Sequence, residues 1–369
     1  MIGQYVWKDF GINWSVPTLK RKMAQFGITY YRDESPIDVL NAIQFELDSA
    51  RKLVGIRTMQ LRLRMHHDLL VTRDQVHSIM TLTDYDGLQK RRHRVLQRRI
   101  FFSKGSNWVW SIDGYDKFQA FGIYIHGAMD TFSRRLLWLR VYNSNKDPAL
   151  IASYFFDFIT EEKVFPVRTR TDYGVEACIL AQCQIFLRRQ HRDAFAFDNA
   201  HYNGRSELNQ TIEAWWSRQR RYNSQYWLDE LQTLRESGLW ERDDIIDRWI
   251  LLYVYIPLLE TELADLKMAY NAHKIRKQKG KLRPDGVPDD MYYFPERFGG
   301  QEEGFVPSDN DLQRIATQHG LGRPLPNYIP DEVRTVSSNW CRSHGVTVTV
   351  ANAATVYQHL RQYVKDKIR

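Results

Sequence analysis

The stretch WVWSIDGYDKF, residues 108–118, decides how the rest of this chain is interpreted. Its apolar first half, residues 108–112, is typical of a buried strand, and the run ends at Asp113 and Gly114. Such a strand delivers a carboxylate to the edge of a sheet. The alternative, which this stretch alone leaves open, is an ordinary strand followed by an Asp-Gly turn.

Length and composition indicate a large folded protein. The chain has 369 residues and a mass of 43.8 kDa, which is enough for two or three domains. Hydrophobic residues make up 43 % of it, so most of the chain should fold rather than stay disordered.

The positive charge is concentrated in one region. The net charge is +8 and the pI about 9.2, a balance that favours a polyanionic partner. Residues 51–105 hold 13 Lys/Arg and 4 Asp/Glu, a local surplus of +9 that accounts for the whole excess. Six of these cations form a run that would neutralise DNA phosphates or act as a nuclear import signal: Lys90, Arg91, Arg92, Arg94, Arg98 and Arg99.

Cysteine usage and hydropathy indicate an intracellular protein. Cys178, Cys183 and Cys341 fit neither a disulfide framework nor a Cys-x-x-Cys zinc site, so we expect a reducing compartment. No signal peptide is visible, and the longest apolar run, residues 249–259, contains Pro257 and is too short to span a bilayer. We therefore expect no membrane partner.

The first hundred residues have helical periodicity. Helices are expected over residues 14–28, with Ser15 as N-cap, and from Pro36 onward. Residues 55–82 predict two short helices joined by a tight connection, with Thr72 and Gln75 as a capping box. This pattern indicates a helix-turn-helix that enters a DNA major groove, and an ordinary helical bundle with a basic face is the alternative. The first of the two helices should point Arg57, Arg62 and Arg64 outward.

From residue 108 onward the hydrophobic pattern changes from that of helices to that of strands. Apolar runs at 121–125 and 136–141 flank a polar turn at 130–134, which predicts an antiparallel meander of three strands. A helix should start at Pro148, and a further strand should end on Asp172, followed by a helix over 175–189. Asp116 and Asp130 are interpreted as turn or surface acids.

A third acid lies in a different kind of element. Residues 206–221 contain no Gly or Pro and have apolar residues at helical spacing, so Glu213 should lie on a helix. Asn209 and Arg220, four residues before and seven after Glu213, would share its face. Trp215 and Trp216 could stack on a base, but at this spacing one of them should belong to the core.

The order of these three acids resembles the acidic triad of the DDE integrases and transposases. The segments IDGYDK, IHGAMDTFSRRLLWL, RTDYG and NQTIEAWWSRQRR are similar to the integrase-core proteins of animal and fungal genomes, themselves similar to bacterial insertion-sequence transposases and retroviral integrases. The resemblance covers roughly residues 15–300. It implies an α/β fold: an RNase H-like core with a mixed five-stranded sheet flanked by helices, preceded by an all-α helix-turn-helix region.

The resemblance also implies a division of the chain. We expect a helical DNA-binding region at 1–105, the RNase H-like catalytic core at 106–240, a helical and basic extension at 241–300 and a C-terminal tail at 301–369. Family members act as dimers or tetramers on paired DNA ends, so a homo-oligomer that binds DNA, with a nuclear location, is expected.

The resemblance implies metal-dependent chemistry. Asp113, Asp172 and Glu213 would be both the catalytic residues and the ligands of two Mg²⁺ or Mn²⁺ ions, with Asp113 bridging the two. Phosphodiester cleavage and strand transfer need charge stabilised on the attacking and leaving oxygens, which such ions supply. Arg220 and Asn209 would contact DNA beside the acids. Lys274, Arg276 and Lys277 would make a second phosphate contact, with a solvated loop as the alternative.

Two departures leave other functions open. Tyr173 replaces the small or amide residue usual after the second acid, and forty residues separate Asp172 from Glu213, with the extra length placed in a loop at 191–205. The zinc module of retroviral integrases is also missing. The alternatives are a domesticated, non-catalytic DNA-binding or assembly protein that retains the fold, and an RNase H-like nuclease that acts on RNA:DNA hybrids.

Overall fold

The computed structural model describes residues 2–29, 31–48, 54–83, 103–204, 209–277 and 283–367. The chain divides into two compact units, Met1–Leu96 and Gln97–Arg369. The boundaries predicted from the sequence stay predictions, and each unit is described by itself.

The first unit is all-helical, as expected. Val39 and Ile43 of α3, Met59 and Leu63 of α4 and Val76 of α5 are among the buried residues of its core. Thr72 Oγ1 accepts from the Gln75 backbone N–H at 3.3 Å while the Gln75 side chain accepts from that of Thr72 at 2.8 Å, which confirms the capping box. The helices are α1 (Ile2–Phe10), α2 (Val16–Gln25), α3 (Pro36–Asp48), α4 (Ile56–His67) and α5 (Arg73–Thr83).

One arginine of this unit is not where the sequence placed it. Arg62 was expected to point outward, but its side chain is 1 % exposed and its Nε lies 2.7 Å from Glu46 Oε2, which is itself buried. His67 Nε2 lies 3.1 Å from the other oxygen of the same carboxylate. The expectation was wrong because Glu46 comes from another helix, α3, and a buried partner makes burial of an arginine tolerable.

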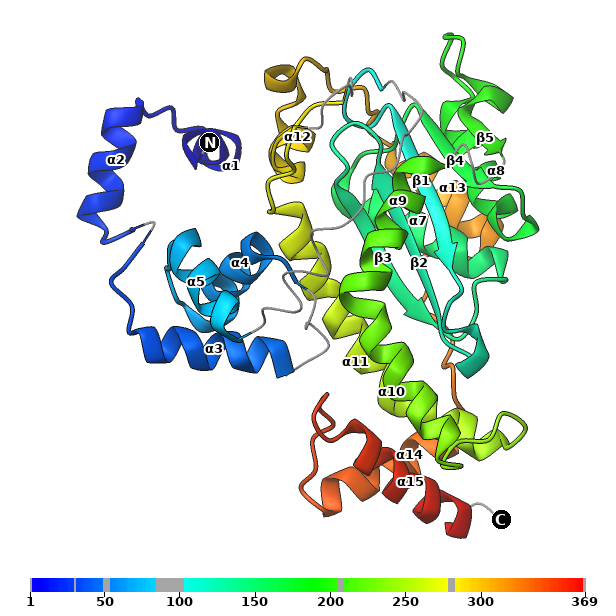
Figure 1. The fold of residues 1–369 in the computed structure, drawn as a ribbon. Helices are drawn as coiled ribbons and strands as arrows, with labels where there is room; N and C mark the ends of the chain where they lie inside the picture. The colour runs from blue at the N-terminus through cyan, green and yellow to red at the C-terminus, as the bar shows by residue number, and fades with distance from the viewer. Residues whose placement is uncertain are drawn as a thin grey trace. The chain divides into compact units, whose positions relative to one another are not determined.

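The second unit is built on a mixed five-stranded sheet with strand order β3-β2-β1-β4-β5 (Figure 1). The first three strands form the predicted antiparallel meander, and β4 and β5 continue the sheet parallel to β1. Two details differ: Phe121 belongs to a 3₁₀ turn before β2, and β5 lies within the segment 191–205 interpreted as a loop. The strands are β1 (Val109–Tyr115), β2 (Tyr124–Asp130), β3 (Leu136–Tyr142), β4 (Arg168–Asp172) and β5 (His201–Gly204).

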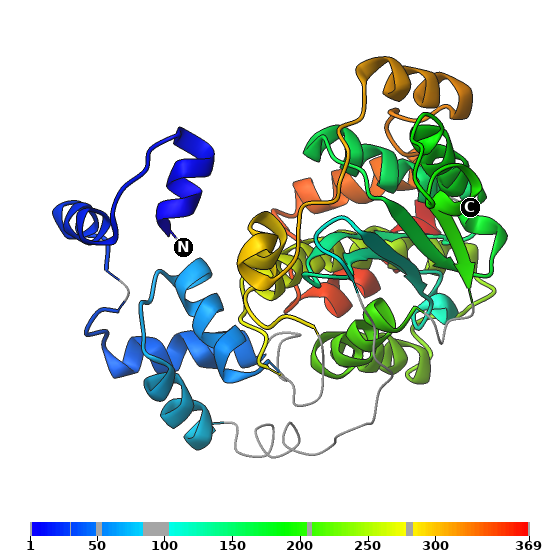
Figure 2. The same ribbon diagram turned by 90° about the horizontal axis from the view of Figure 1, so that it is seen from above.

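Helices cover both faces of this sheet (Figure 2). On one face, α7 (Pro148–Glu162) and α8 (Cys178–Arg188) bury an apolar cluster that includes Trp110 and Ile112 of β1. On the other, α9 (Gln210–Gln219) packs against β1 and β2. A π-helical turn, Arg220–Ser224, joins α9 to α10 (Gln225–Glu236). Because side chains alternate along a strand, β1 presents Trp110 and Ile112 to the first face and Asp113 to the second.

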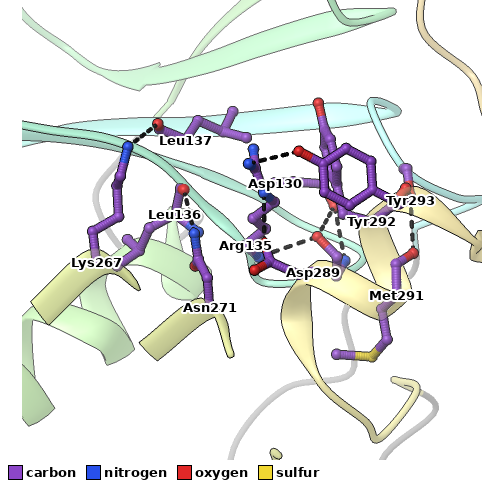
Figure 3. A network of polar contacts seen from close by, with 12 residues as sticks. Asp130, Arg135, Leu136, Leu137, Lys267, Asn271, Asp289, Met291, Tyr292 and Tyr293 are labelled. Carbon is purple, nitrogen blue, oxygen red and sulfur yellow. Dashed lines mark hydrogen bonds and ion pairs between the residues drawn. The ribbon is translucent and has the colours of Figure 1, made fainter. Parts of the chain in front are cut away.

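The long helix α11 (Ile245–Asn271) closes one edge of the sheet. The Asn271 side chain accepts from the Leu136 backbone N–H at 2.8 Å and donates to the Leu136 carbonyl at 2.9 Å. Lys267 Nζ donates to the next carbonyl, that of Leu137, at 3.4 Å (Figure 3). An amide thus pairs with the outer edge of β3 as a neighbouring strand would.

Residues 283–305, which we call the strap, lie against the β2–β3 hairpin. Arg135 Nε contacts Asp289 Oδ1 at 2.8 Å, and the same guanidinium donates to the Tyr293 hydroxyl at 3.0 Å (Figure 3). Its Cζ lies 4.7 Å from the ring centroid of Tyr292, and Arg134 donates to the Pro284 carbonyl. These contacts attach the strap to the turn between β2 and β3.

The C-terminal residues are largely helical. Val356, Leu360 and Val364 are buried on α15, the helix expected from their spacing. Arg361 and Lys365 of the same helix contact the buried Asp247 of α11 at 2.6 and 2.7 Å. In the described parts of the chain no helix is both long and apolar enough to cross a membrane. The helices are α12 (Pro288–Tyr293), α13 (Asp309–His319), α14 (Asp331–Ser343) and α15 (Ala353–Lys367).

Candidate active site

Asp113 lies near the end of the central strand, on the face covered by α9. It pairs in register with Gly127 of β2 and is half-buried. The indole Nε1 of Trp216, on α9, donates to Asp113 Oδ2 at 3.0 Å. Because the donor belongs to α9, the position of the Asp113 carboxylate depends on how α9 packs on the sheet.

A glycine makes room for that indole. A Cβ built on Gly127 would lie 3.1 Å from two ring atoms of Trp216 and 2.9 Å from Leu139 Cδ2, closer than ordinary van der Waals contact. On its other side Trp216 stacks on Tyr115, with ring centroids 5.0 Å apart. The indole therefore lies over the β1–β2 pair, in contact with Tyr115 and at a place where Gly127 has no Cβ.

Asp172 is the last residue of β4, as predicted. Since β4 runs parallel to β1 and Arg170 pairs with Ser111, the alternation of side chains places Asp172 on the same face as Asp113. Asp172 Oδ1 is buried and has no hydrogen-bond partner among the described residues. Such a buried carboxylate oxygen is an acceptor without a donor.

Glu213 lies in the first turn of α9, so the third acid is on a helix as the spacing predicted. The start of α9 is held by Asn209, whose Nδ2 donates to the Ile112 carbonyl of β1 at 3.0 Å. That bond attaches the helix to the residue before Asp113. The three acids therefore come from two parallel strands and one helix tied to the first of them.

The three carboxylates interact electrostatically. Burial, and then the charges of Glu213 and Asp172, raise the pKa of Asp113 well above its ordinary value, against the opposing effect of the Trp216 hydrogen bond. Burial and Asp172 also raise the pKa of Glu213, opposed by Lys117. Burial is the main cause that raises the pKa of Asp172, against a hydrogen bond from the Asn209 side chain that lowers it. Like charges held together in this way favour a cation between them.

The donor set fits a hard divalent cation by its chemistry. All three groups offer carboxylate oxygens, the ligands that Mg²⁺ prefers, and one of those oxygens is buried without a donor. Within the described ranges, however, no three His, Cys, Asp or Glu side chains are arranged as a ready group around one ion. The three acids interact electrostatically, but an ion bound among them would need further ligands to complete its coordination shell.

The other predicted residues fall into three sets. Arg220 is exposed at the start of the π-helical turn, whereas Asn209 is 1 % exposed and engaged with β1. Lys274, Arg276 and Lys277 are exposed just after α11. The cations of the run 90–99 lie outside the described residues. Contact of any of these residues with DNA stays a prediction.

One feature of the site was missed from the sequence. Trp216 was considered only as a core residue or a base-stacking residue, although it lies three residues after Glu213 and so near its face of the helix. Glu176, a weaker candidate acid in the sequence, lies beside the site: its carboxylate is close to Gly174 and its charge adds to the raised pKa of Asp172.

The strand order and the helices on both faces of the sheet define an RNase H-like domain. Residues 100–287 match the family model of the integrase core domain, and the chain belongs to that family. Membership implies a DNA substrate and DNA transesterification of the integrase or transposase type. A comparison with curated proteins gave no match.

Proposed function

We propose that this protein is a DDE-type integrase or transposase that cleaves DNA strands and transfers them to a new site. The observation that carries the proposal is the placement of the three acids: Asp113 and Asp172 lie on one face of two parallel strands, and Glu213 lies in the first turn of the helix that packs on this face. The raised pKa of Asp113 supports it, because perturbed carboxylates cluster at functional sites.

Each residue has a role in this proposal. Asp113, Asp172 and Glu213 would hold two Mg²⁺ or Mn²⁺ ions, which supply charge stabilisation to the attacking and leaving oxygens of the phosphodiester. Trp216 orients Asp113 through its indole N–H, and Asn209 keeps α9, and with it Glu213, against β1. Arg220 would bind a phosphate at the surface beyond Glu213.

The test is cleavage and joining of DNA ends by the purified full chain with and without Mg²⁺. Asp113→Asn, Asp172→Asn and Glu213→Gln should each lower the rate by at least about a thousandfold, because each removes a ligand charge. Asp116→Asn serves as the matched control, since Asp116 is an exposed acid three residues from Asp113 that accepts from Asn145 at 3.0 Å. Unchanged rates in all three variants would overturn the proposal.

A second candidate is a non-catalytic DNA-binding or assembly protein that retains the fold. It is favoured by the lack, among the described residues, of a ready three-ligand group for one ion. The same assay separates the two candidates. If the native chain binds DNA ends but neither cleaves nor joins them with Mg²⁺ or Mn²⁺, the second candidate is the function.

The rest of the proposal concerns DNA capture. The first unit would bind duplex DNA with the α4–α5 pair, and the exposed Lys274, Arg276 and Lys277 would bind a second stretch of backbone. Assembly as a dimer or tetramer and a nuclear location complete the proposal. Sedimentation of the chain with and without paired DNA ends measures the first, and imaging of the tagged chain measures the second.

A further inference from the structure

A row of cations and aromatic rings in contact with one another lies at the β4–β5 end of the sheet. Lys104 Nζ is 4.4 Å from the ring centroid of Trp108, which packs edge-on against Phe195 at 5.0 Å. Arg168 lies over Phe195 at 5.1 Å and over Tyr202 at 5.6 Å, and Arg170 lies over Tyr202 at 5.2 Å. We call this row the ladder: Lys104, Trp108, Phe195, Arg168, Tyr202 and Arg170.

Three members of the ladder, Arg168, Arg170 and Tyr202, share a strand face with the candidate active site. Arg168, Arg170 and Asp172 alternate along β4, so their side chains leave the same face of the sheet. Tyr202 of β5 pairs in register with Arg170 and extends that face toward the sheet edge. Successive positions on this face are about 6.6 Å apart, and the third of them is the acid. The ladder therefore leads directly to Asp172.

The ladder is accessible and positively charged. Lys104 is exposed and the other five members are half-buried, so the rings are not core residues. Burial lowers the pKa of Arg168 and Arg170, and the Arg168 charge adds to the effect on Arg170. Asp193, the acid two residues before Phe195, contacts Arg188 at 2.5 Å. Its charge is thus already matched by another arginine.

The chemistry of the ladder matches that of an unpaired nucleic-acid strand. Cations contact backbone phosphates and aromatic rings stack on bases, so a surface that carries both fits a strand whose bases are exposed. Arg168 Nε donates to the Asn199 carbonyl at 2.8 Å, which holds this guanidinium in place. A duplex hides its base faces, so it would use only the cations. The position of the row beside Asp172 connects it to the reacting phosphodiester.

From this geometry we infer that the ladder binds a single-stranded extension of the DNA substrate and guides it to Asp172. The inference deepens the proposed function and rests on it, because it names the form of DNA that this site accepts. The preferred substrate would be a DNA end with unpaired nucleotides beside the scissile bond.

The test measures binding in EDTA, so that it does not depend on catalysis. Fluorescence anisotropy compares the full chain on a blunt duplex and on the same duplex with a short oligothymidine extension. The double variant Phe195→Leu and Tyr202→Leu should lose about tenfold or more in affinity for the extended duplex, and less than about twofold for the blunt one. Equal losses on both DNAs, or no loss on either, would overturn the inference.

Two controls separate binding from folding. The double variant Tyr363→Leu and Lys367→Ala removes a cation–aromatic pair of similar type on α15 and should leave both affinities unchanged. Tyr202→Phe keeps the ring and should retain the affinity for the extension. If Tyr202→Phe loses as much as the leucine variant while its melting temperature is unchanged, stacking is not the cause and the inference fails.

A second measurement needs no variant. Iodouracil placed in the extension should photocrosslink to Phe195 or Tyr202, and peptide mass mapping identifies the site. Crosslinks confined to the first unit would contradict the ladder. Since neither measurement involves cleavage, an inactive protein could still pass both, and an active one could fail both.

Discussion

The β1–β2 strand pair carries two acids, one toward each end, and the protein treats them in opposite ways. Asp130 is fully buried and accepts from the Asn107 backbone N–H at 2.9 Å and from the backbone N–H and hydroxyl of Ser133 at 2.8 and 2.6 Å. Asp113 is half-buried and accepts from one indole at 3.0 Å, and the charges of two other carboxylates raise its pKa.

The difference separates an acid that serves folding from one that serves chemistry. Asp130 accepts hydrogen bonds from the β2–β3 turn and from the segment before β1. These hydrogen bonds replace those that its carboxylate would make with water. Asp113 instead raises the energy of the folded chain, because the like charges near it are not matched by equivalent donors. A carboxylate with this little compensation is the one expected to bind a cation. The predictions below test this contrast, from the largest expected effect to the smallest.

Asp130→Ala should cost about 3–5 kcal/mol of unfolding free energy. The substitution removes an acceptor from three donors and leaves two buried backbone N–H groups unpaired. The measurement is denaturant unfolding of the variant against the native chain. Asp116→Ala, which removes an exposed acid, should cost less than about 1 kcal/mol, and equal costs for the two variants would remove the contrast.

Asp130 should also make stability depend on pH. Burial raises the pKa of Asp130 to about 6, above the value of about 3.9 expected in the unfolded chain. Between these values the folded state binds the proton more tightly, so the free energy of unfolding should decrease as the pH rises from about 4 to 6, by up to about 3 kcal/mol, and then level off.

Comparison with Asp130→Asn isolates this effect. The variant has no titrating group at this position, so its stability relative to the native chain should increase across the same window. A difference between the two chains that stays constant from pH 4 to 7 would show that the Asp130 pKa is not raised.

Gly127→Ala should disturb the packing around Asp113 and lower the free energy of unfolding by about 1–3 kcal/mol. The added methyl would lie 3.1 Å from the Trp216 ring, so α9 must shift or the indole must turn away from Asp113. The assay pairs thermal unfolding with Mg²⁺-dependent cleavage. Gly55→Ala, which meets nothing within 4 Å, is the control and should change both by little. Full cleavage by the Gly127 variant would show that the Trp216 contact is dispensable.

Asp113→Asn should leave stability unchanged or raise it by roughly 1 kcal/mol in EDTA. The amide removes one of the repelling charges and still accepts from the Trp216 indole. Mg²⁺ should then raise the melting temperature of the native chain more than that of the variant, since only the native chain has all three acids. A loss of stability like that of Asp130→Ala would place the two acids in one class.

The elements of the site were predictable because their signals are local. An apolar run followed by an acid located Asp113, a short β-branched segment between Pro166 and Gly174 located Asp172, and the period of residues 206–221 placed Glu213 on a helix. Signals that depend on distant partners were missed. The burial of Arg62 requires Glu46 from another helix, and the role of Trp216 requires a glycine on β2.

The fifth strand shows a different limit. The segment HYNG that forms β5 is four residues long and contains no apolar alternation, so nothing in it marks a strand. It becomes one because β4 offers an unpaired edge, along which Thr169 to Asp172 pair with His201 to Gly204. The sequence predicted five strands through family resemblance, and pairing with β4 decided where the last one lies.

The outer edge of β3 is partly blocked against pairing with a strand of another chain. At the β3 edge, the Asn271 side chain pairs with both backbone groups of Leu136, so the hydrogen bonds that would recruit an incoming strand there are already used. This amide side chain therefore disfavours edge-to-edge aggregation. Asn271→Leu should therefore leave the site intact and lower the concentration at which the protein remains soluble.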